Sequence, residues 1–243
     1  MSFDTNIRQY LTTHGFERCA LKAVLFDMDG VLFDSMPGHA LAWAGAAKEF
    51  GLEMSREDVY LNEGRTGSGT INLLARRQWG HDATPGQIQA IYDAKARRFN
   101  ALPEAPVMPG AAELLDTIRN QGFQIILVTG SGQQSLLQRL DRHFPGLFRP
   151  DVMVTSFDVT RGKPYPEPYL KGLRKAGVRP FEAIVVENAP LGVQSAVAAG
   201  IFTIAVNTGP LPDNTLLHAG ANLLFPSMQA LRNDWPELQH RLQ

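Results

Sequence analysis

The sequence has one cysteine, almost no net charge and no long apolar run. Cys19 alone excludes an internal disulfide framework and fits a reducing compartment. The 23 Lys and Arg residues against 24 Asp and Glu residues give a formal charge of -1, so no broad basic field attracts nucleic acid or an acidic membrane. No stretch reaches the roughly 18 apolar residues of a membrane span.

The first 19 residues also lack the apolar region of a secretory signal. These absences together predict a cytoplasmic protein with no membrane or nucleic-acid partner. We expect it to be a monomer.

The 243 residues, 44% of them apolar, are enough to form a full globular core. An apolar run at about 22–27 predicts a first strand. From residue 108 onward, short apolar runs alternate with helical segments, and the runs lie at 125–129, 152–155, 183–187, 202–206 and 222–225. Continuous apolar runs separated by helices favour a parallel sheet covered on both faces, a Rossmann-like α/β fold.

Between the first strand and residue 108 the sequence contains no β run. Four helical segments are predicted there instead, at 37–50, 55–61, 68–79 and 85–101. The chain is therefore predicted to have a discontinuous core domain, residues 1–34 and 108–243, with an all-helical insertion at residues 35–107 that we call the cap. Residues 1–20 are predicted to form an extra helix packed on the core domain.

Polar residues follow the apolar runs. In LFDMDGVLFDS, Asp27 and Asp29 come directly after the first run, while Lys163 lies in the loop after the third. Other run ends carry Thr129, Gly130 and Ser131, and then Glu187 and Asn188. Ligands of open α/β sheets bind beyond the carboxyl ends of the strands, so these groups are predicted to meet.

The chemistry of this set favours phosphoryl transfer. Neighbouring carboxylates repel one another unless a cation is present, and Mg²⁺ prefers oxygen ligands while leaving room for substrate phosphate. A lysine, a hydroxyl and backbone N–H groups at a helix start are suited to the oxygens of a transferring phosphoryl group.

These motifs resemble those of the haloacid dehalogenase superfamily of phosphotransferases: D-x-D-G-V at 27–31, Thr129, K-P-x-P-x-x-Y at 163–169 and the acid Glu187. The helical insertion places the sequence in the branch with a helical cap, which includes β-phosphoglucomutase, phosphoglycolate phosphatase and small-molecule pyrophosphatases. The resemblance implies the fold of that superfamily and a Mg²⁺ cofactor.

Carried onto this sequence, the resemblance implies a role for each motif residue. Asp27 would be the nucleophile that forms an aspartyl-phosphate, and Asp29 the general acid and base. Thr129, Gly130 and Ser131 would bind phosphate, Lys163 would neutralise charge, and the metal ligands would be Asp27, Asp29, Glu187 and Asn188. Asn188 departs from the pattern, because many members have a carboxylate there.

Four cap residues are candidates for substrate binding: His39, Glu63, Arg65 and Lys95. Each also has a structural interpretation, in which His39 braces the linker, Glu63 is a solvated loop residue, Arg65 is a surface charge and Lys95 is an exposed helix lysine. The stretches EGRTG at 63–67 and ENAPLG at 187–192 look most like the pyrophosphatase members.

The sequence therefore predicts a Mg²⁺-dependent phosphohydrolase acting on a small phosphorylated metabolite, with inorganic pyrophosphate the leading candidate. A phosphohexomutase of the β-phosphoglucomutase type is the alternative. A non-catalytic protein that binds a phosphorylated ligand is a more remote one, since Asn188 could have abolished metal binding.

Overall fold

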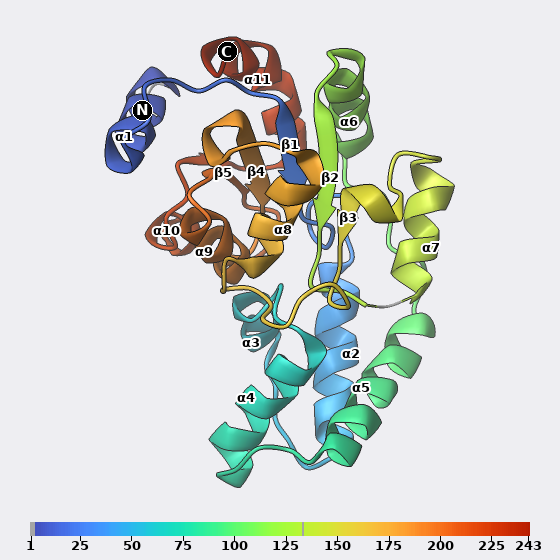
Figure 1. The fold of residues 1–243 in the computed structure, drawn as a ribbon. Coiled ribbons are helices and arrows are strands. Elements are labelled where there is room, and N and C mark those ends of the chain that lie inside the picture. The colour runs from blue at the N-terminus through green and yellow to red at the C-terminus, as the bar shows by residue number, and fades with distance from the viewer. Residues whose placement is uncertain (1–2, 133) are drawn as a thin grey trace.

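A computed structural model describes residues 3–132 and 134–243, of which 134–137 only as backbone. In this part of the chain the sheet has six strands: β1 (Ala23–Phe26), β2 (Gln124–Val128), β3 (Met153–Val154), β4 (Ala183–Glu187), β5 (Phe202–Val206) and β6 (Leu223–Phe225). All neighbouring strands are parallel, in the order β3-β2-β1-β4-β5-β6 (Figure 1). The predicted Rossmann-like parallel sheet is confirmed.

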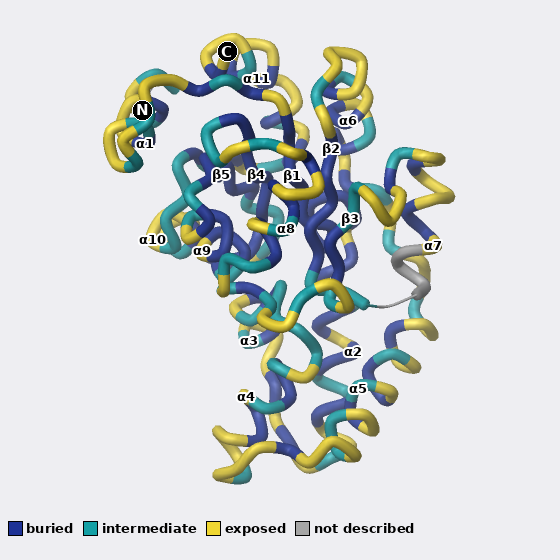
Figure 2. The backbone as a smooth tube through the Cα atoms, in the orientation of Figure 1, coloured by how far each residue is buried: buried dark blue, intermediate teal, exposed yellow. Residues whose placement is uncertain are grey.

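Both faces of the sheet are covered, which explains why the strands read as continuous apolar runs. In β1, Val24 and Phe26 belong to the hydrophobic cluster that also contains residues of α1 (Phe3–His14), α6 (Ala111–Asn120) and α11 (Met228–Arg241). Ala23 and Leu25 belong to a second cluster with α8 (Glu167–Ala176) and α9 (Pro190–Ala198). Figure 2 shows the buried strands between exposed helix surfaces.

The predicted extra helix near the start of the chain is α1. It is held on the core by the hydroxyl of Tyr10, which donates to the carbonyl of Gly200 at 2.9 Å, and by the amide of Asn6, which donates to the carbonyl of Asn222 at 2.5 Å. The remaining helices of the core are α7 (Gln134–His143) and α10 (Asp213–His218). No helix in the described residues is long and apolar enough to cross a membrane.

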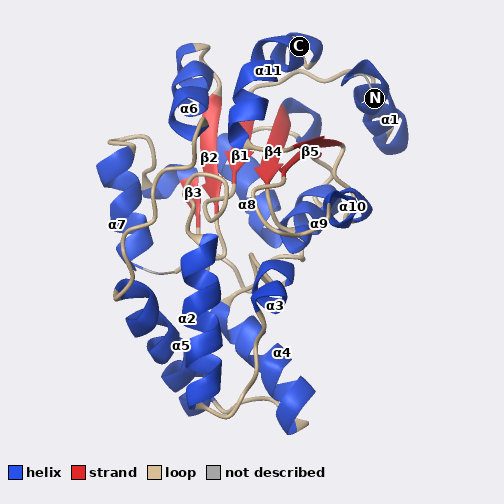
Figure 3. Ribbon diagram, turned by 180° about the vertical axis from the view of Figure 1, so that it is seen from behind, coloured by secondary structure: helices blue, strands red, loops and turns tan. Residues whose placement is uncertain are grey.

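The cap contains α2 (Met36–Glu49), α3 (Arg56–Leu61), α4 (Gly67–Trp79) and α5 (Pro85–Asn100), close to the predicted ranges. Capping boxes at Ser55 with Asp58 and at Thr84 with Gln87 fix the starts of α3 and α5. Figures 1 and 3 show these helices beyond the carboxyl ends of the strands, with α2 and α5 side by side.

The cap has a hydrophobic cluster of its own, which includes Trp43 and Ile71. One member, Leu211, comes from the core loop that follows β5. The boundaries of the two domains at 34/35 and 107/108 remain a proposal: most buried apolar residues of the cap form this cluster, while Ala42 and Phe99 belong to the cluster of the core.

Candidate active site

The turn after β1 separates the two aspartates of the D-x-D motif. Gly30 has a φ of +80°, a conformation that favours glycine, and a side chain at this position would collide with Asn188. The N–H of Asp27 still bonds the carbonyl of Val186 at 3.1 Å, so Asp27 continues the sheet ladder, whereas Asp29 lies in the turn. The two carboxylates therefore meet different partners.

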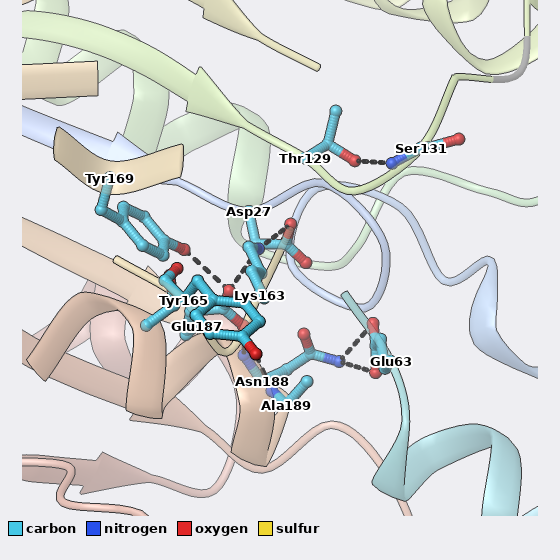
Figure 4. Close-up of polar contacts among 11 residues, drawn as sticks. Asp27, Glu63, Thr129, Ser131, Lys163, Tyr165, Tyr169, Glu187, Asn188 and Ala189 are labelled. Atoms are coloured by element: carbon cyan, nitrogen blue, oxygen red, sulfur yellow. Dashed lines mark hydrogen bonds and ion pairs between the residues drawn. The ribbon is translucent and has the colours of Figure 1, made fainter. Parts of the chain in front are cut away.

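Lys163 lies between Asp27 and Glu187. Its Nζ is 2.7 Å from Oδ1 of Asp27 and 2.5 Å from Oε1 of Glu187, and all three side chains are buried (Figure 4). Burial alone would lower the pKa of Lys163, but the two carboxylates raise it above its usual range. Burial raises the pKa of Asp27 to about 7, against the lowering effect of Lys163. Lys163 is thus a fixed cation beside the candidate nucleophile.

Both oxygens of Glu187 are already hydrogen-bonded. Oε1 accepts from Lys163 and from the hydroxyl of Tyr169 at 2.7 Å, and Oε2 accepts from the backbone N–H groups of Asn188 and Ala189 at 3.0 and 3.3 Å (Figure 4). This arrangement makes Glu187 an anchor for Lys163, and its role as a metal ligand stays a prediction. Sequence reasoning gave Tyr169 no role, although it ends the K-P-x-P-x-x-Y motif.

Asp29 is held from the start of α2. Its Oδ1 accepts from the hydroxyl of Ser35 at 2.6 Å and lies 3.1 Å from Nε2 of His39. Burial would raise the pKa of Asp29, but His39 and Ser35 lower it overall. The ring of His39 also stacks on Phe99, with centroids 4.3 Å apart. His39 therefore contacts a candidate catalytic group, and Ser35 is a further site residue that sequence reasoning missed.

Thr129 directly follows β2 and is 3% exposed. Its hydroxyl oxygen accepts a hydrogen bond from the N–H of Ser131 at 3.0 Å (Figure 4), which shapes the loop 129–131. The cap rests on this loop, since a side chain at Gly130 would collide with the carbonyl of Gly64. The predicted phosphate-binding loop is thus covered by residue 64 of the cap.

Glu63 is not a solvated loop residue. It is 8% exposed, and the amide Nδ2 of Asn188 donates to its two carboxylate oxygens at 3.1 and 3.2 Å (Figure 4). Burial raises the pKa of Glu63 well above its usual value, and the charges of Asp27 and Asp29 add to this effect. A cap carboxylate therefore lies at the site without a cationic partner among the described contacts.

Lys95 is also buried, so the interpretation as an exposed helix lysine is wrong. Its Nζ lies 5.5 Å from the ring centroid of Trp43 and 5.0 Å from that of Phe99, distances typical of cation–π contacts. Burial lowers the pKa of Lys95 to about 7, although Asp29 opposes this. Arg65 is half-buried rather than fully exposed.

Core and cap residues together line one cavity of about 70 Å³. The core supplies Asp27, Asp29, Thr129, Gly130 and Ser131, and the cap supplies His39, Glu63, Arg65 and Lys95. Lys163, Glu187 and Asn188 do not line the cavity and lie behind its wall. The structure thus brings the predicted site residues together around one cavity between the core and the cap.

The donor set suits a hard metal ion, although no three His, Cys, Asp or Glu side chains of the described chain are arranged to hold one. The amide oxygen of Asn188 is buried and has no hydrogen-bond partner among the described residues. Asn188 also lies between the acids of the core and Glu63. An unpaired oxygen acceptor among carboxylates fits Mg²⁺, which takes oxygen ligands of mixed charge.

The parallel sheet, the acids at its strand ends and the inserted helices define an α/β enzyme with a helical cap. Residues 21–200 match the model of the haloacid dehalogenase-like hydrolases, and the chain belongs to this family. Within it, the chain falls in the β-phosphoglucomutase-like branch.

Hexitol phosphatase A of Escherichia coli (strain K12) is 34% identical over 191 residues, which cover 78% of this chain and 84% of that protein. The beta-phosphoglucomutase of Bacillus subtilis (strain 168) is 27% identical over 91% of this chain and 98% of that protein. A solved structure from Bacteroides vulgatus, provisionally named a beta-phosphoglucomutase, has 58% identity and a TM-score of 0.96, covering 99% of this chain and 98% of that one.

Proposed function

We propose that the protein is a Mg²⁺-dependent phosphohydrolase that acts through an aspartyl-phosphate, with inorganic pyrophosphate as its leading candidate substrate. The observation that carries the choice of substrate is the buried contact between Glu63 of the cap and Asn188 of the core. The remaining site residues support the phosphoryl-transfer chemistry.

In the first step a carboxylate oxygen of Asp27 attacks phosphorus and the bond to the leaving oxygen breaks. Lys163, 2.7 Å from Asp27, opposes the effect of burial, which raises the pKa of Asp27 to about 7, and so favours the ionised nucleophile. Thr129 and Gly130 line the cavity, and the hydroxyl of Thr129 and the N–H of Gly130 would bind the phosphoryl oxygens, because the N–H groups of Thr129 and Ser131 already donate to other oxygens. Water then hydrolyses the aspartyl-phosphate.

Asp29 supplies and removes the protons in both steps. The pKa of Asp29 is lowered, so Asp29 is ionised and can accept a proton from the attacking water in the second step. A bound phosphate brings negative charge close to Asp29 and raises its pKa, which favours the protonated form needed to protonate the leaving oxygen. His39 and Ser35 orient this carboxylate through hydrogen bonds to one of its oxygens.

Asp27 and the amide oxygen of Asn188 would hold Mg²⁺, with Glu63 as a further ligand. The bound ion would supply charge neutralisation for the phosphoryl oxygens. The amide of Asn188 contributes no charge, and the carboxylate of Glu63 would supply a negative charge near the metal in its place.

Two features favour pyrophosphate over a sugar phosphate. Glu63 and Gly64 of the cap reach the core loops and narrow the cavity above Asp27. A carboxylate at this point would leave little room for a sugar ring attached to the phosphate. A small substrate with its charge close to the metal suits such a site best.

A sugar phosphate is the second candidate, because the named relatives include a hexitol phosphatase and a beta-phosphoglucomutase. A mutase of this type would keep the same aspartyl-phosphate chemistry but exclude water long enough to return the phosphate. His39 and Lys95 near Asp29 are compatible with binding a sugar hydroxyl.

The third candidate function is binding of a phosphorylated ligand without catalysis.

The test is phosphate release in the presence of Mg²⁺ from pyrophosphate, β-glucose-1-phosphate, phosphoglycolate and hexitol phosphates. We expect kcat/KM for pyrophosphate to exceed the others more than about tenfold, roughly 1.4 kcal/mol of transition-state preference. Asp27→Asn should abolish all turnover. Glu63→Ala should lower kcat/KM for pyrophosphate to the level of the other substrates. Glu57→Ala, on the exposed face of α3, is the matched control.

Conversion of β-glucose-1-phosphate to glucose-6-phosphate, with pyrophosphate left intact, would establish the mutase instead. No turnover of any substrate, together with stabilisation by phosphate alone, would establish the binding protein.

A further inference from the structure

We propose that Arg65 is the specificity-determining residue for the leaving group, and that its guanidinium binds the second phosphoryl group of a phosphoanhydride. This inference rests on the proposed phosphohydrolase function. Arg65 lines the cavity, and its Nε is buried without a hydrogen-bond partner among the described residues. Because this Nε is closed to solvent, an anion in the cavity would bind the terminal N–H groups of the guanidinium, for which no hydrogen bond to the described residues is found.

The backbone around Arg65 is held against the core. A methyl group at Gly64 would lie 2.7 Å from Cδ of Lys163, and Gly64 also touches Gly130 of the predicted phosphate-binding loop. Residue 65 therefore begins on the wall of the cavity that faces Asp27 and the loop 129–131.

The side chain of Arg65 is placed by the start of α4. A Cβ at Gly69 would lie 2.9 Å from Cγ and 3.3 Å from Cδ of Arg65. The aliphatic part of the Arg65 side chain therefore packs directly against this glycine. In contrast, the surface arginines Arg76 and Arg77 of the same helix are paired with Asp82 and Asp58. No ion pair with a carboxylate is found for Arg65 in the described chain, which leaves its charge available.

The direction of the reaction puts the leaving group on this wall. The attacking and leaving oxygens lie roughly in line across phosphorus, and Asp27 attacks from the core side, so the leaving oxygen faces the cap. When pyrophosphate reacts, the bridging P–O bond breaks as the bond to Asp27 forms, and Asp29 protonates the oxygen that leaves as inorganic phosphate. This leaving group carries a second phosphoryl group for Arg65 to bind, whereas the leaving group of a phosphomonoester carries none.

The other charged groups of the cap are less suited to this anion. Glu63 repels it unless a metal lies between them, and Lys95 lies over the rings of Trp43 and Phe99 close to Asp29. A guanidinium carries a permanent charge and offers two parallel N–H donors to a phosphate. Arg65 would thus distinguish a phosphoanhydride from a phosphomonoester.

The experiment compares pyrophosphate with p-nitrophenyl phosphate, which shares the Asp27 chemistry but has no second phosphate. Arg65→Gln is expected to lower kcat/KM for pyrophosphate at least about 30-fold and that for p-nitrophenyl phosphate less than about threefold. Arg65→Lys should retain part of the activity on pyrophosphate, since it keeps the charge. Arg97→Gln, at an exposed position of α5, is the control and should change neither.

Equal losses on both substrates, or no loss on pyrophosphate, would overturn the proposal. A binding measurement separates its failure from that of the proposed function. Inorganic pyrophosphate and inorganic phosphate are titrated calorimetrically into Asp27→Asn protein with Mg²⁺, with and without Arg65→Gln. If Arg65→Gln weakens binding of pyrophosphate but not of phosphate, the role of Arg65 holds even where the wild type does not hydrolyse pyrophosphate. If it weakens binding of both ligands equally, or changes neither, the role of Arg65 is refuted.

Discussion

The side-chain amide of Asn188 donates to both carboxylate oxygens of Glu63, at 3.1 and 3.2 Å, and so joins the end of β4 to the cap loop. The two residues are 125 positions apart in the sequence. An aspartate at position 188 would place a second buried carboxylate against Glu63, and like charges at such a distance repel. The two residues therefore form a matched pair in the closed site.

This pairing predicts non-additive effects of mutation. Asn188→Asp should lower kcat/KM for pyrophosphate about tenfold, roughly 1.4 kcal/mol. The new carboxylate would repel the carboxylate of Glu63 and so disfavour its position at the site. Adding Glu63→Gln should recover much of the loss, giving a coupling energy of at least about 1 kcal/mol in a double-mutant cycle. The same cycle with Glu57→Gln on the cap surface should be additive. Additive effects for Glu63 as well would contradict the pairing.

Removal of the Lys163 charge should destabilise the fold. Lys163→Met leaves the buried carboxylates of Asp27 and Glu187 facing each other without their common cation. Breaking a buried ion pair in this way costs about 3–5 kcal/mol, which would appear as a lower urea midpoint. Lys171→Met removes the half-exposed pair with Glu167 and should cost less than about 1 kcal/mol. Similar losses for the two variants would mean that the Lys163 pair is not structurally important.

The hydroxyl of Tyr169 should affect kcat more than KM. Tyr169→Phe removes the 2.7 Å hydrogen bond to Glu187, which in turn holds Lys163 beside the nucleophile. We expect a loss of about 1 kcal/mol of stability and a fall in kcat of about three- to tenfold. KM should not change, because neither Tyr169 nor Glu187 lines the cavity. Tyr165→Phe, with a partly exposed ring, is the control, and an increase in KM alone would count against this role.

Cys19 should be almost unreactive in the folded protein. Burial raises the pKa of its thiol to about 11, so only about one molecule in a thousand carries the thiolate at pH 8. The rate of labelling by a disulfide reagent should rise about tenfold per pH unit between pH 8 and 10. Unfolding in urea should accelerate it at pH 8 by at least about 100-fold. Rapid labelling of the native protein at pH 8 would show that the thiol is accessible and ionised.

Much of the core could be predicted because its strands are buried on both faces. The run at 183–187 is β4 without a change of bounds, and the run at 125–129 differs from β2 (Gln124–Val128) by one residue at each end. Once the strands are known, the rule that ligands bind beyond their carboxyl ends brings Asp27, Thr129 and Glu187 to one edge. The sequence carries this information directly, as apolar runs followed by polar residues.

Contacts that depend on side-chain direction could not be predicted. Ser35 lies in the quoted stretch LFDMDGVLFDS, but its bond to Asp29 requires the turn at Gly30 and the start of α2 to meet. Lys95 has the pattern of an ordinary helix lysine, and only the packing of α2 against α5 buries it over Trp43 and Phe99. Neither contact leaves a periodic signal in the sequence.

Leu211 belongs to the core loop but lies within the hydrophobic cluster of the cap, and the side chain of Asn207 fixes this loop by donating to the carbonyl of Leu211 at 2.9 Å. Separation of the cap from the core would therefore expose apolar surface on both sides, at a cost of about 1.5–3 kcal/mol for the leucine alone. Exposure of apolar surface increases the heat capacity. If separation of the cap from the core limits turnover, the Eyring plot of kcat should be curved. Leu211→Ala should reduce this curvature, because less apolar surface is exposed when the cap separates.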